Sequence, residues 1–273
     1  MLYKKSDLFS FLNSIDKRPK KTLSQNFLID GNILRKIISS ANISPEDIVL
    51  EIGSGPGVIT EALLANNVQV YAVEKDTNFA TELKRLDKNN TLHIFNEDFL
   101  KCDLEKILPQ NTKIKVIGNL PYHISSPILI KLLSHKKLFS KMTLMFQKEV
   151  IQRITASCKT KEYGSLTIFT NYHADIDEVF PVSKNCFYPS PKVDSAVISL
   201  SPKASIFKEN EEDFFKLTRA VFQKRRKTLY SSIKHLYDPA IIKDLLKSFN
   251  LPVMTRGEDL SLEQYIQLFK MLS

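Results

Sequence analysis

The stretch from Val49 to Thr60 reads VLEIGSGPGVIT and has the pattern of a strand, a glycine turn and a helix. The β-branched run Ile48–Ile52 is typical of a strand that is buried on both faces, and the alternating glycines allow a sharp turn close to a ligand. Helical spacing resumes over Val58–Leu64, so the free N–H groups at the start of this helix would face that ligand. The pattern predicts a cofactor site.

The spacing of the glycines narrows the class of cofactor. A dinucleotide fingerprint places its third glycine five residues after the first, whereas here Gly57 follows Gly53 by four, with Gly55 between them. Glu51, just before the turn, would repel a pyrophosphate but attract a positive charge. We therefore expect S-adenosylmethionine, which carries a sulfonium and an ammonium group.

Acidic residues also follow the next two predicted strands. Val68–Val73 is followed by Glu74, placed where a carboxylate can accept from both hydroxyls of a ribose. Leu92–Phe95 is followed by Asp98, an acceptor for an adenine amino group, and by the aromatic Phe99. A single acid in such a position can be a helix cap. Three acids at one sheet edge favour the cofactor site.

Composition excludes several classes of protein. The 273 residues are 43% hydrophobic and 25% charged, which suits one large domain or one medium and one small domain. The sequence shows neither a signal-peptide core nor a run of about eighteen apolar residues, so we expect a cytoplasmic protein without a membrane segment. Its three cysteines are widely spaced, which argues against a disulfide framework and a cysteine-rich zinc site. We expect no metal.

Two clusters of basic residues contribute to the net charge of +9. They are Lys17-Arg18-Pro19-Lys20-Lys21 and Lys224-Arg225-Arg226-Lys227. Either cluster alone is as typical of a solvated tail or helix face as of a nucleic-acid contact. Because both lie outside the predicted cofactor site and the net charge is strongly positive, we expect them to bind nucleic acid.

The remaining pattern predicts an α/β fold followed by a helical domain. The predicted elements of the first part are helices over 33–41 and 149–156, strands over 114–118 and 142–147, and a closing hairpin of strands 176–180 and 193–200. After Ser201-Pro202-Lys203 the spacing is helical, over 212–235, 239–249 and 261–272, the last capped by Ser261. We therefore predict a domain over 1–202, with a basic N-terminal arm, and a second over 203–273.

The tetrapeptide Asn119-Leu120-Pro121-Tyr122 follows the predicted strand 114–118. The exocyclic nitrogen of adenine is a poor nucleophile because its lone pair is delocalised into the ring. An Asn side-chain oxygen and a backbone carbonyl can accept its two N–H bonds and stabilise a pyramidal nitrogen, while Tyr122 offers a face for a flipped-out base. Asn-x-Pro is also common in turns, so the tetrapeptide alone would indicate only a turn. Its position beside the predicted cofactor site favours a role in catalysis.

These motifs, in this order, resemble the ribosomal RNA adenine dimethyltransferases, specifically the small-subunit enzymes that dimethylate two adjacent adenosines near the 3′ end of 16S rRNA. The motifs that carry the resemblance are QNFL at 25–28, EIGSGPG at 51–57, VE at 73–74, ED at 97–98, NLPY at 119–122, QKEV at 147–150, FYPSPKVDS at 187–195, FQKRRKTL at 222–229 and RGEDLSLE at 256–263. Ser24 and His123 depart from the family pattern, which usually has glycine and asparagine there.

The resemblance implies a class I S-adenosylmethionine-dependent methyltransferase with a Rossmann-like seven-stranded sheet and a small all-α domain that recognises the ribosomal particle. Carried over residue by residue, it places Asn26, Leu28, Gly53, Glu74, Asp98 and Asn119 at the cofactor. The expected cofactor site also includes Glu51, Gly55, Lys75 and Phe99. It also implies that the target base meets Asn119, Leu120 and Tyr122, with Phe187 on its other face. The implied partner is 16S rRNA in the small subunit or its precursor, bound by a monomer.

Three functions therefore compete. The first is the small-subunit dimethyltransferase, with a role in small-subunit maturation. The second is the related antibiotic-resistance methyltransferase, which modifies a large-subunit adenine; the motifs at 222–229 and 256–263 favour the first. The third is a binding protein on the same scaffold without catalysis, against which the intact Glu51, Glu74, Asp98 and Asn119 argue.

Overall fold

The computed structural model describes residues 2–20, 23–224 and 226–272, and the chain divides into two compact units. The first comprises Met1–Ile151 and Asp175–Pro202, the second Gln152–Ala174 and Lys203–Ser273. The sequence predicted 1–202 as one domain, but Gln152–Ala174 clusters with the second unit. The reason is helix α8 (Ser165–His173), which contributes apolar side chains to the core of that unit.

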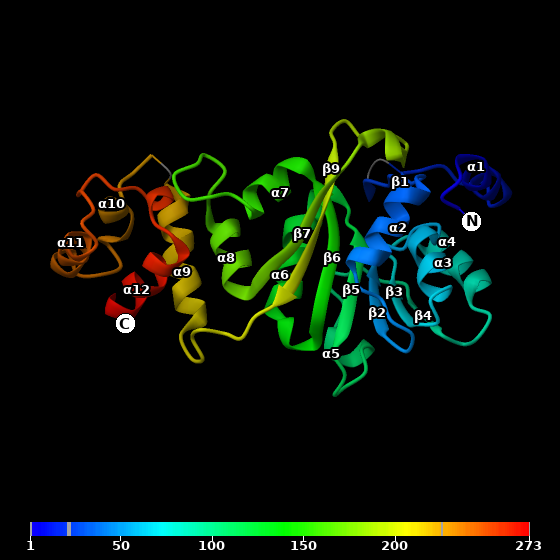
Figure 1. Cartoon of the computed structure of the whole chain (residues 1–273), viewed down its shortest axis with the longest axis horizontal. Helices are drawn as coiled ribbons and strands as arrows, with labels where there is room; N and C mark the ends of the chain where they lie inside the picture. Colours follow the sequence, from blue (N-terminus) through cyan, green and yellow to red (C-terminus); the bar gives the residue numbers. More distant parts are fainter. Residues whose placement is uncertain (1, 21–22, 225, 273) are drawn as a thin grey trace. The chain divides into compact units, whose positions relative to one another are not determined.

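The first unit is built on a seven-stranded sheet (Figure 1). Its strands, in spatial order, are β4 (Leu92–Phe95), β3 (Gln69–Val73), β2 (Ile48–Ile52), β5 (Ile114–Asn119), β6 (Phe139–Gln147), β9 (Ser195–Pro202) and β7 (Ala174–Val182). The strands from β4 to β6 pair in parallel, whereas β9 runs antiparallel to β6. The two strands predicted to close the sheet as a hairpin are the neighbours β9 and β7, which confirms that prediction.

Helices and a small second sheet complete this unit. The helices are α1 (Lys5–Ser14), α2 (Gly31–Ser40), α3 (Val58–Leu64), α4 (Thr77–Leu83), α5 (Leu104–Ile107), α6 (Ser125–Ser134) and the beginning of α7 (Lys148–Ile154). The second sheet pairs β1 (Phe27–Leu28) with β8 (Phe187–Tyr188) in antiparallel fashion. The first twenty residues, predicted as a basic arm, contain α1, whose Leu8 and Leu12 are buried against Phe27 and Phe79.

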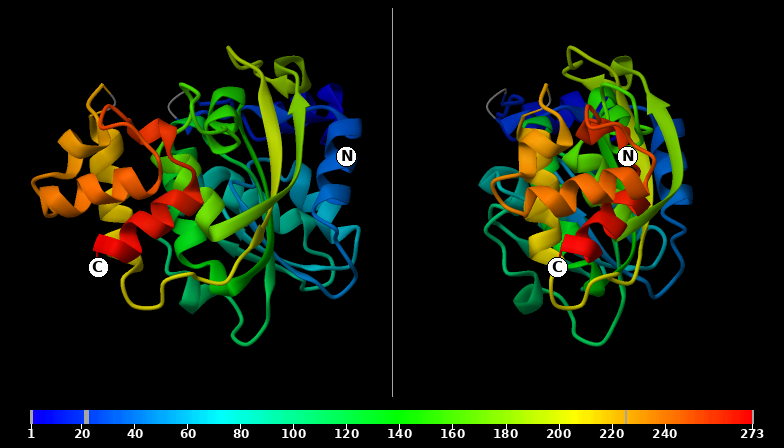
Figure 2. Two further views of the ribbon diagram at one scale, coloured as in Figure 1. Left: turned by 60° about the vertical axis from the view of Figure 1, so that its left-hand side comes forward. Right: turned by 90° about the vertical axis from the view of Figure 1, so that its left-hand side faces the viewer.

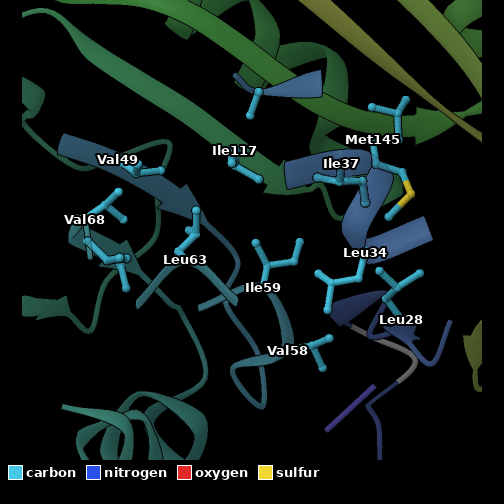
Figure 3. Close-up of a cluster of buried hydrophobic side chains, with 14 of the residues drawn as sticks. Leu28, Leu34, Ile37, Val49, Val58, Ile59, Leu63, Val68, Ile117 and Met145 are labelled. Carbon is cyan, nitrogen blue, oxygen red and sulfur yellow. The ribbon is translucent and has the colours of Figure 1, made fainter. Parts of the chain in front are cut away.

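Both faces of the central strands are buried, as the run of β-branched residues predicted. On one face, Val49 and Ile117 pack with side chains of α2 and α3, including Ile37 and Ile59 (Figure 3). Since side chains alternate along a strand, Leu50 lies on the opposite face, and it too is fully buried. Burial of apolar surface stabilises this arrangement by about 25 cal/mol per Å². The packing also holds the ends of the parallel strands in place.

The second unit is helical (Figure 2). Besides α8 it contains α9 (Glu211–Gln223), α10 (Leu229–Ile233), α11 (Pro239–Ser248) and α12 (Leu262–Leu272). Ser261 caps α12 as predicted, since its hydroxyl accepts from the N–H of Gln264 at 3.3 Å. Within the described ranges, no helix combines the length and the apolar character needed to cross a bilayer.

One predicted helix of the second unit is wrong. The spacing predicted a single helix over 212–235, but α9 ends at Gln223 and α10 begins at Leu229. Thr228 is extended and its hydroxyl accepts from the N–H of Ser231 at 3.2 Å, while Leu229 donates to the carbonyl of Thr255 at 2.8 Å. The break therefore depends on a contact with a loop that is distant in sequence. Helical periodicity within residues 212–235 contains no information about that contact.

Candidate active site

A cleft opens where four parallel strands end. The segments that line it follow β2, β3, β4 and β5, and the loop 23–27 contributes a fifth wall. The structure brings most of the predicted cofactor and target residues together in this cleft, namely Asn26, Gly53, Gly55, Glu74, Lys75, Asp98, Phe99, Asn119, Leu120 and Tyr122. The carboxyl ends of adjacent parallel strands share one sheet edge, which explains why residues as far apart in sequence as Gly53 and Tyr122 meet here.

The glycine turn between β2 and α3 is possible only because its glycines adopt positive φ. Gly55 has φ +50° and Gly57 has φ +95°, a region that other residues rarely occupy. A Cβ on Gly57 would lie 2.6 Å from Cδ1 of Leu86. The turn thereby brings the N–H of Gly55 to 2.8 Å from Oε2 of Glu74, the acid that follows β3.

Glu74 is anchored by backbone donors on both oxygens. Besides the bond from Gly55, the N–H of Asp76 donates to Oε1 at 2.7 Å. Only 7% of the residue is exposed, and burial raises the pKa of this carboxyl, although the two N–H groups act in the opposite direction. Each carboxylate oxygen has a second lone pair. Glu74 therefore lines the cleft as a fixed acceptor with capacity for two further hydrogen bonds, as a ribose would require.

Asp98 and Lys75, both predicted to contact the cofactor, contact each other. Their Nζ and Oδ2 atoms are 2.8 Å apart, and the N–H of Leu100 donates to Oδ1 at 3.0 Å. The hydrogen bond from Lys75 lowers the pKa of Asp98, so this carboxylate stays ionised at neutral pH. Phe99, the aromatic neighbour, is buried beside it.

Asn119, the last residue of β5, presents an acceptor to the cleft. Its Nδ2 donates to the carbonyl of Asn26 at 2.9 Å. This bond fixes the side-chain amide, because the nitrogen is bound and Oδ1 remains as the acceptor. The following N–H, of Leu120, donates to the carbonyl of Met145 at 3.3 Å and ties the loop to β6. Asn119 and the Leu120 backbone are thus held by neighbours on two sides.

Tyr122 is held by a partner that the sequence did not predict. Its hydroxyl lies 2.7 Å from Oγ of Ser195, the first residue of β9, which is fully buried. Burial raises the pKa of Tyr122, although the hydrogen bond to Ser195 acts in the opposite direction. The phenol is therefore neutral, and Tyr122 is held in the lining of the cleft.

Three predicted site residues do not line the cleft. Leu28 and Phe187 are paired in the β1–β8 sheet and belong to the hydrophobic core, 2% and 3% exposed respectively. Glu51 is 1% exposed, and its Oε2 accepts from the hydroxyl of Thr60 in α3 at 2.6 Å. The alternation of side chains along β2 turns Glu51 towards α3, so the predicted attraction of a cationic cofactor does not act by contact.

Burial raises the pKa of Glu51 from 4.5 to about 7. The folded protein then binds a proton that the unfolded chain releases, so stability should fall as the pH rises from about 4.5 to about 7, by about 3 kcal/mol. We expect Glu51→Gln to remove that share of the pH dependence. Urea denaturation at pH 5 and pH 8 measures it, with the exposed Glu105→Gln as the matched control. If the free energy of unfolding changed equally between pH 5 and pH 8 in the parent, Glu51→Gln and Glu105→Gln proteins, Glu51 would not be a buried acid with a raised pKa.

Two other cleft residues that the sequence did not assign to the site contact each other. Ser24 Oγ and His123 Nδ1 lie 2.9 Å apart and connect the loop 23–27 to the segment that follows Tyr122. Both depart from the family pattern. Gln25 and Phe27 also line the cleft, and their position within the QNFL motif was the available signal.

The donor and acceptor set of the cleft fits S-adenosylmethionine. Glu74 and Asp98 are carboxylate acceptors at adjacent strand ends, and the glycine turn leaves room for a ligand because no Cβ projects from Gly53 or Gly55. Among the residues that the structure describes, no group of three or more His, Cys, Asp and Glu side chains is arranged to hold a metal ion.

Comparison with known proteins identifies similar sequences over nearly the whole chain. Residues 16–273 match the family model described as ribosomal RNA adenine dimethylase. A protein of Protochlamydia amoebophila named ribosomal RNA small subunit methyltransferase A is 46% identical, with 98% of this chain and 96% of that protein covered. Its namesake from Chlamydia trachomatis serovar L2 is 43% identical, with 97% and 96% covered.

Solved structures show the same fold. A dimethyladenosine transferase from Plasmodium falciparum has a TM-score of 0.77 at 31% identity, covering 89% of this chain and 95% of that one. The 23S rRNA methyltransferase ErmE has a TM-score of 0.70 at 25% identity, covering 90% and 99%.

Proposed function

Since this chain belongs to the ribosomal RNA adenine dimethylase family, we propose that it methylates N6 of two adjacent adenosines near the 3′ end of 16S rRNA in the small ribosomal subunit. It is an S-adenosylmethionine-dependent methyltransferase, and the curated relatives carry the name of a small-subunit enzyme. The observation that carries the proposal is the fixed Asn119 acceptor beside the carboxylates of Glu74 and Asp98.

The residues of the cleft divide into two sets with different tasks. We assign Glu74 to the ribose hydroxyls and Asp98 to the adenine amino group of the cofactor, with Gly53 and Gly55 giving backbone access. When bound, S-adenosylmethionine supplies a methyl group made electrophilic by its sulfonium. Asn119 lines the cleft where β5 ends, and we assign it to both the cofactor and the target base.

Asn119 and the Leu120 carbonyl would act on the target adenine as paired acceptors. Two acceptors aligned on the two N–H bonds favour a pyramidal amino nitrogen, whose lone pair is then localised for attack. Tyr122 supplies the stacking face, and a base stacked on an aromatic ring gains about 1 to 3 kcal/mol. We restrict the stacking to Tyr122, because Phe187 is part of the buried core in this structure.

The large-subunit alternative remains the second candidate, because ErmE shares the fold at a TM-score of 0.70. The names of the relatives that are 43 to 46% identical favour the small subunit. The third possibility, a binding protein without catalysis, is disfavoured by the assembled cleft. There the Asn26 carbonyl accepts from Nδ2 of Asn119, which leaves Oδ1 of Asn119 as an acceptor for the target base.

The deciding experiment is mass spectrometry of nucleosides from ribosomal subunits incubated with the protein and labelled cofactor. We expect label in N6,N6-dimethyladenosine from small subunits, with N6-methyladenosine appearing transiently. Stacking does not depend on the amino hydrogens, so the monomethyl product should retain enough binding for a second transfer. Label confined to large subunits would overturn the substrate assignment, and a reaction that stops at one methyl would overturn the proposed arrangement of the target base.

The basic clusters are the proposed contacts with rRNA phosphates. Lys224, Arg226 and Lys227 are exposed in the segment between α9 and α10. Lys17 and Arg18 follow α1, and the predicted Lys20 also follows it but is paired with Asp76 at 2.8 Å. The predicted Lys21 and Arg225 lie outside the described residues. We include in the same proposal a monomeric state, a cytoplasmic location and a role in small-subunit maturation.

Replacing Lys224, Arg226 and Lys227 with alanine is expected to weaken binding to the small subunit and to flatten its salt dependence. On duplex DNA, each phosphate that a cation no longer neutralises lowers the steepness of log K against log salt by about 0.9, and on single strands by about 0.7. Filter binding between about 50 and 200 mM salt measures the slope. Cofactor affinity in the absence of RNA serves as the control and should not change. An unaltered slope would assign this cluster to a solvated face.

A further inference from the structure

The loop that forms the fifth wall of the cleft is fastened on both sides. We call Lys20 together with Leu23–Phe27 the strap. On one side, Nζ of Lys20 and Nε2 of Gln25 donate to Oδ2 of Asp76 at 2.8 and 3.2 Å. On the other, Ser24 contacts His123 and the Asn26 carbonyl accepts from Asn119. The strap therefore connects the segment after β3 to the segment after β5.

Hydrogen bonds within the strap make it a single piece. The N–H of Lys20 donates to Oε1 of Gln25 at 2.7 Å, and the N–H of Gln25 donates to the carbonyl of Lys20 at 3.3 Å. The Nδ2 of Asn26 donates to the carbonyl of Ser24 at 3.1 Å. A displacement of Lys20 would therefore be transmitted through Gln25 to Asn26, which holds the amide of Asn119.

Asp76 occupies the junction between the strap and the cofactor site. Its side chain is 3% exposed, against 47% for Lys20. Its N–H donates to Glu74 and its Oδ1 accepts from the N–H of Asn78 at 3.1 Å, which caps α4. Burial alone would raise the pKa of Asp76, but the hydrogen bonds from Lys20, Gln25 and Asn78 outweigh it and the pKa is lowered. The carboxylate is therefore ionised and compensated by its partners.

We propose that the Lys20–Asp76 ion pair positions the strap for cofactor binding, so that Lys20 and Asp76 are positioning residues of the methyltransferase site. This inference rests on the proposed location of the cofactor in the cleft. It gives Lys20 a different role from its basic neighbours, because its ammonium is engaged by a buried carboxylate on the cofactor side. A strap held in place before binding avoids the entropy of ordering it when the ligand arrives.

The first test compares two cationic residues of the same cluster. In calorimetry without RNA, we expect Lys20→Met to weaken S-adenosylmethionine binding about five- to tenfold because the strap is no longer preorganised, and Arg18→Met to leave it within about twofold. If Lys20 acted only on RNA phosphates, neither substitution would change cofactor affinity. Equal affinity in Lys20→Met and the parent protein would overturn the proposal.

A double-mutant cycle identifies the partner. Asp76→Asn should weaken cofactor binding to a similar extent, and the double variant Lys20→Met/Asp76→Asn should bind no more weakly than Asp76→Asn alone, because the two residues act through one ion pair. Additive losses of affinity would show that they act independently and would overturn the pairing. Lys20→Met leaves the Asp76 cap of α4 in place, so it keeps the test valid even if Asp76→Asn folds poorly.

Amide hydrogen exchange provides a readout independent of the ligand. Exchange of the strap amides should be faster in the Lys20→Met protein than in the parent and unchanged in Arg18→Met, since a detached strap opens locally. Unchanged exchange in Lys20→Met would contradict the proposal. A parent protein that fails to bind S-adenosylmethionine would instead refute the cofactor location itself, so the two failures are distinguishable.

Discussion

Replacing Asn119 with alanine is expected to lower the rate of methyl transfer a hundredfold or more while the protein stays folded and binds RNA. Removal of one group aimed at developing charge typically costs about 10² to 10³ in rate, or about 3 to 4 kcal/mol. In this structure the amide of Asn119 is already fixed by the Asn26 carbonyl, so the acceptor is preorganised before the base arrives. Single-turnover assays on small subunits measure the effect.

Asn119→Asp provides a matched variant for the same position. It keeps an acceptor of the same size but replaces the Nδ2 donor to Asn26 with a second acceptor, so a carboxylate oxygen would face the Asn26 carbonyl. We expect most of the loss in rate to persist, because the side chain would no longer be held in place. Turnover of the alanine variant within a few-fold of the parent would mean that Asn119 merely ends β5.

Replacing Glu74 with alanine is expected to weaken S-adenosylmethionine binding by about 1.5 to 3 kcal/mol, which is the usual contribution of hydrogen bonds to a charged group. Calorimetry at neutral pH measures this directly. The substitution also releases the N–H groups of Gly55 and Asp76, which both donate to this carboxylate. We therefore expect a part of the loss in affinity to come from the glycine turn itself.

Glu74→Gln separates the two contributions. Gln keeps one acceptor oxygen for the Gly55 or the Asp76 N–H but replaces the other with a donor, so the charge is lost and one backbone bond is broken. We expect an intermediate affinity, with thermal stability closer to that of the parent. Unchanged affinity in a folded Glu74→Ala protein would remove Glu74 from the cofactor site.

Local patterns predicted the elements on which the cleft is built. Strand β2 and helix α3 have the predicted bounds, because burial on both faces and helical periodicity leave strong signals in a single stretch. The acids after β3 and β4 reach the same cleft because parallel strands share their carboxyl edge. Glu51 also lies near the carboxyl end of its strand. However, it faces α3 because neighbouring strand residues point to opposite faces.

Interactions across long sequence separations leave no signal in a local sequence pattern. Asp76 binds Lys20 over 56 positions and Tyr122 contacts Ser195 over 73, and nothing in the local pattern distinguishes either partner from an ordinary cap or strand residue. The break before α10 depends on Thr255 in the same way. Phe187 was assigned to the site by resemblance, whereas the core in this structure takes up its ring.

The path of the chain between β6 and β7 has a consequence for any attempt to prepare the two units separately. Because Gln152–Ala174 lies within the first unit's sequence but clusters with the second, a fragment cut after residue 202 would retain α8 without its partners. Ile168 and Tyr172, now at most 1% exposed, would then be exposed to solvent and form an apolar patch that promotes aggregation. Removing the intervening helix and joining β6 to β7 by a short linker would spare the first unit this patch, whereas a separate second unit needs α8 to complete its core.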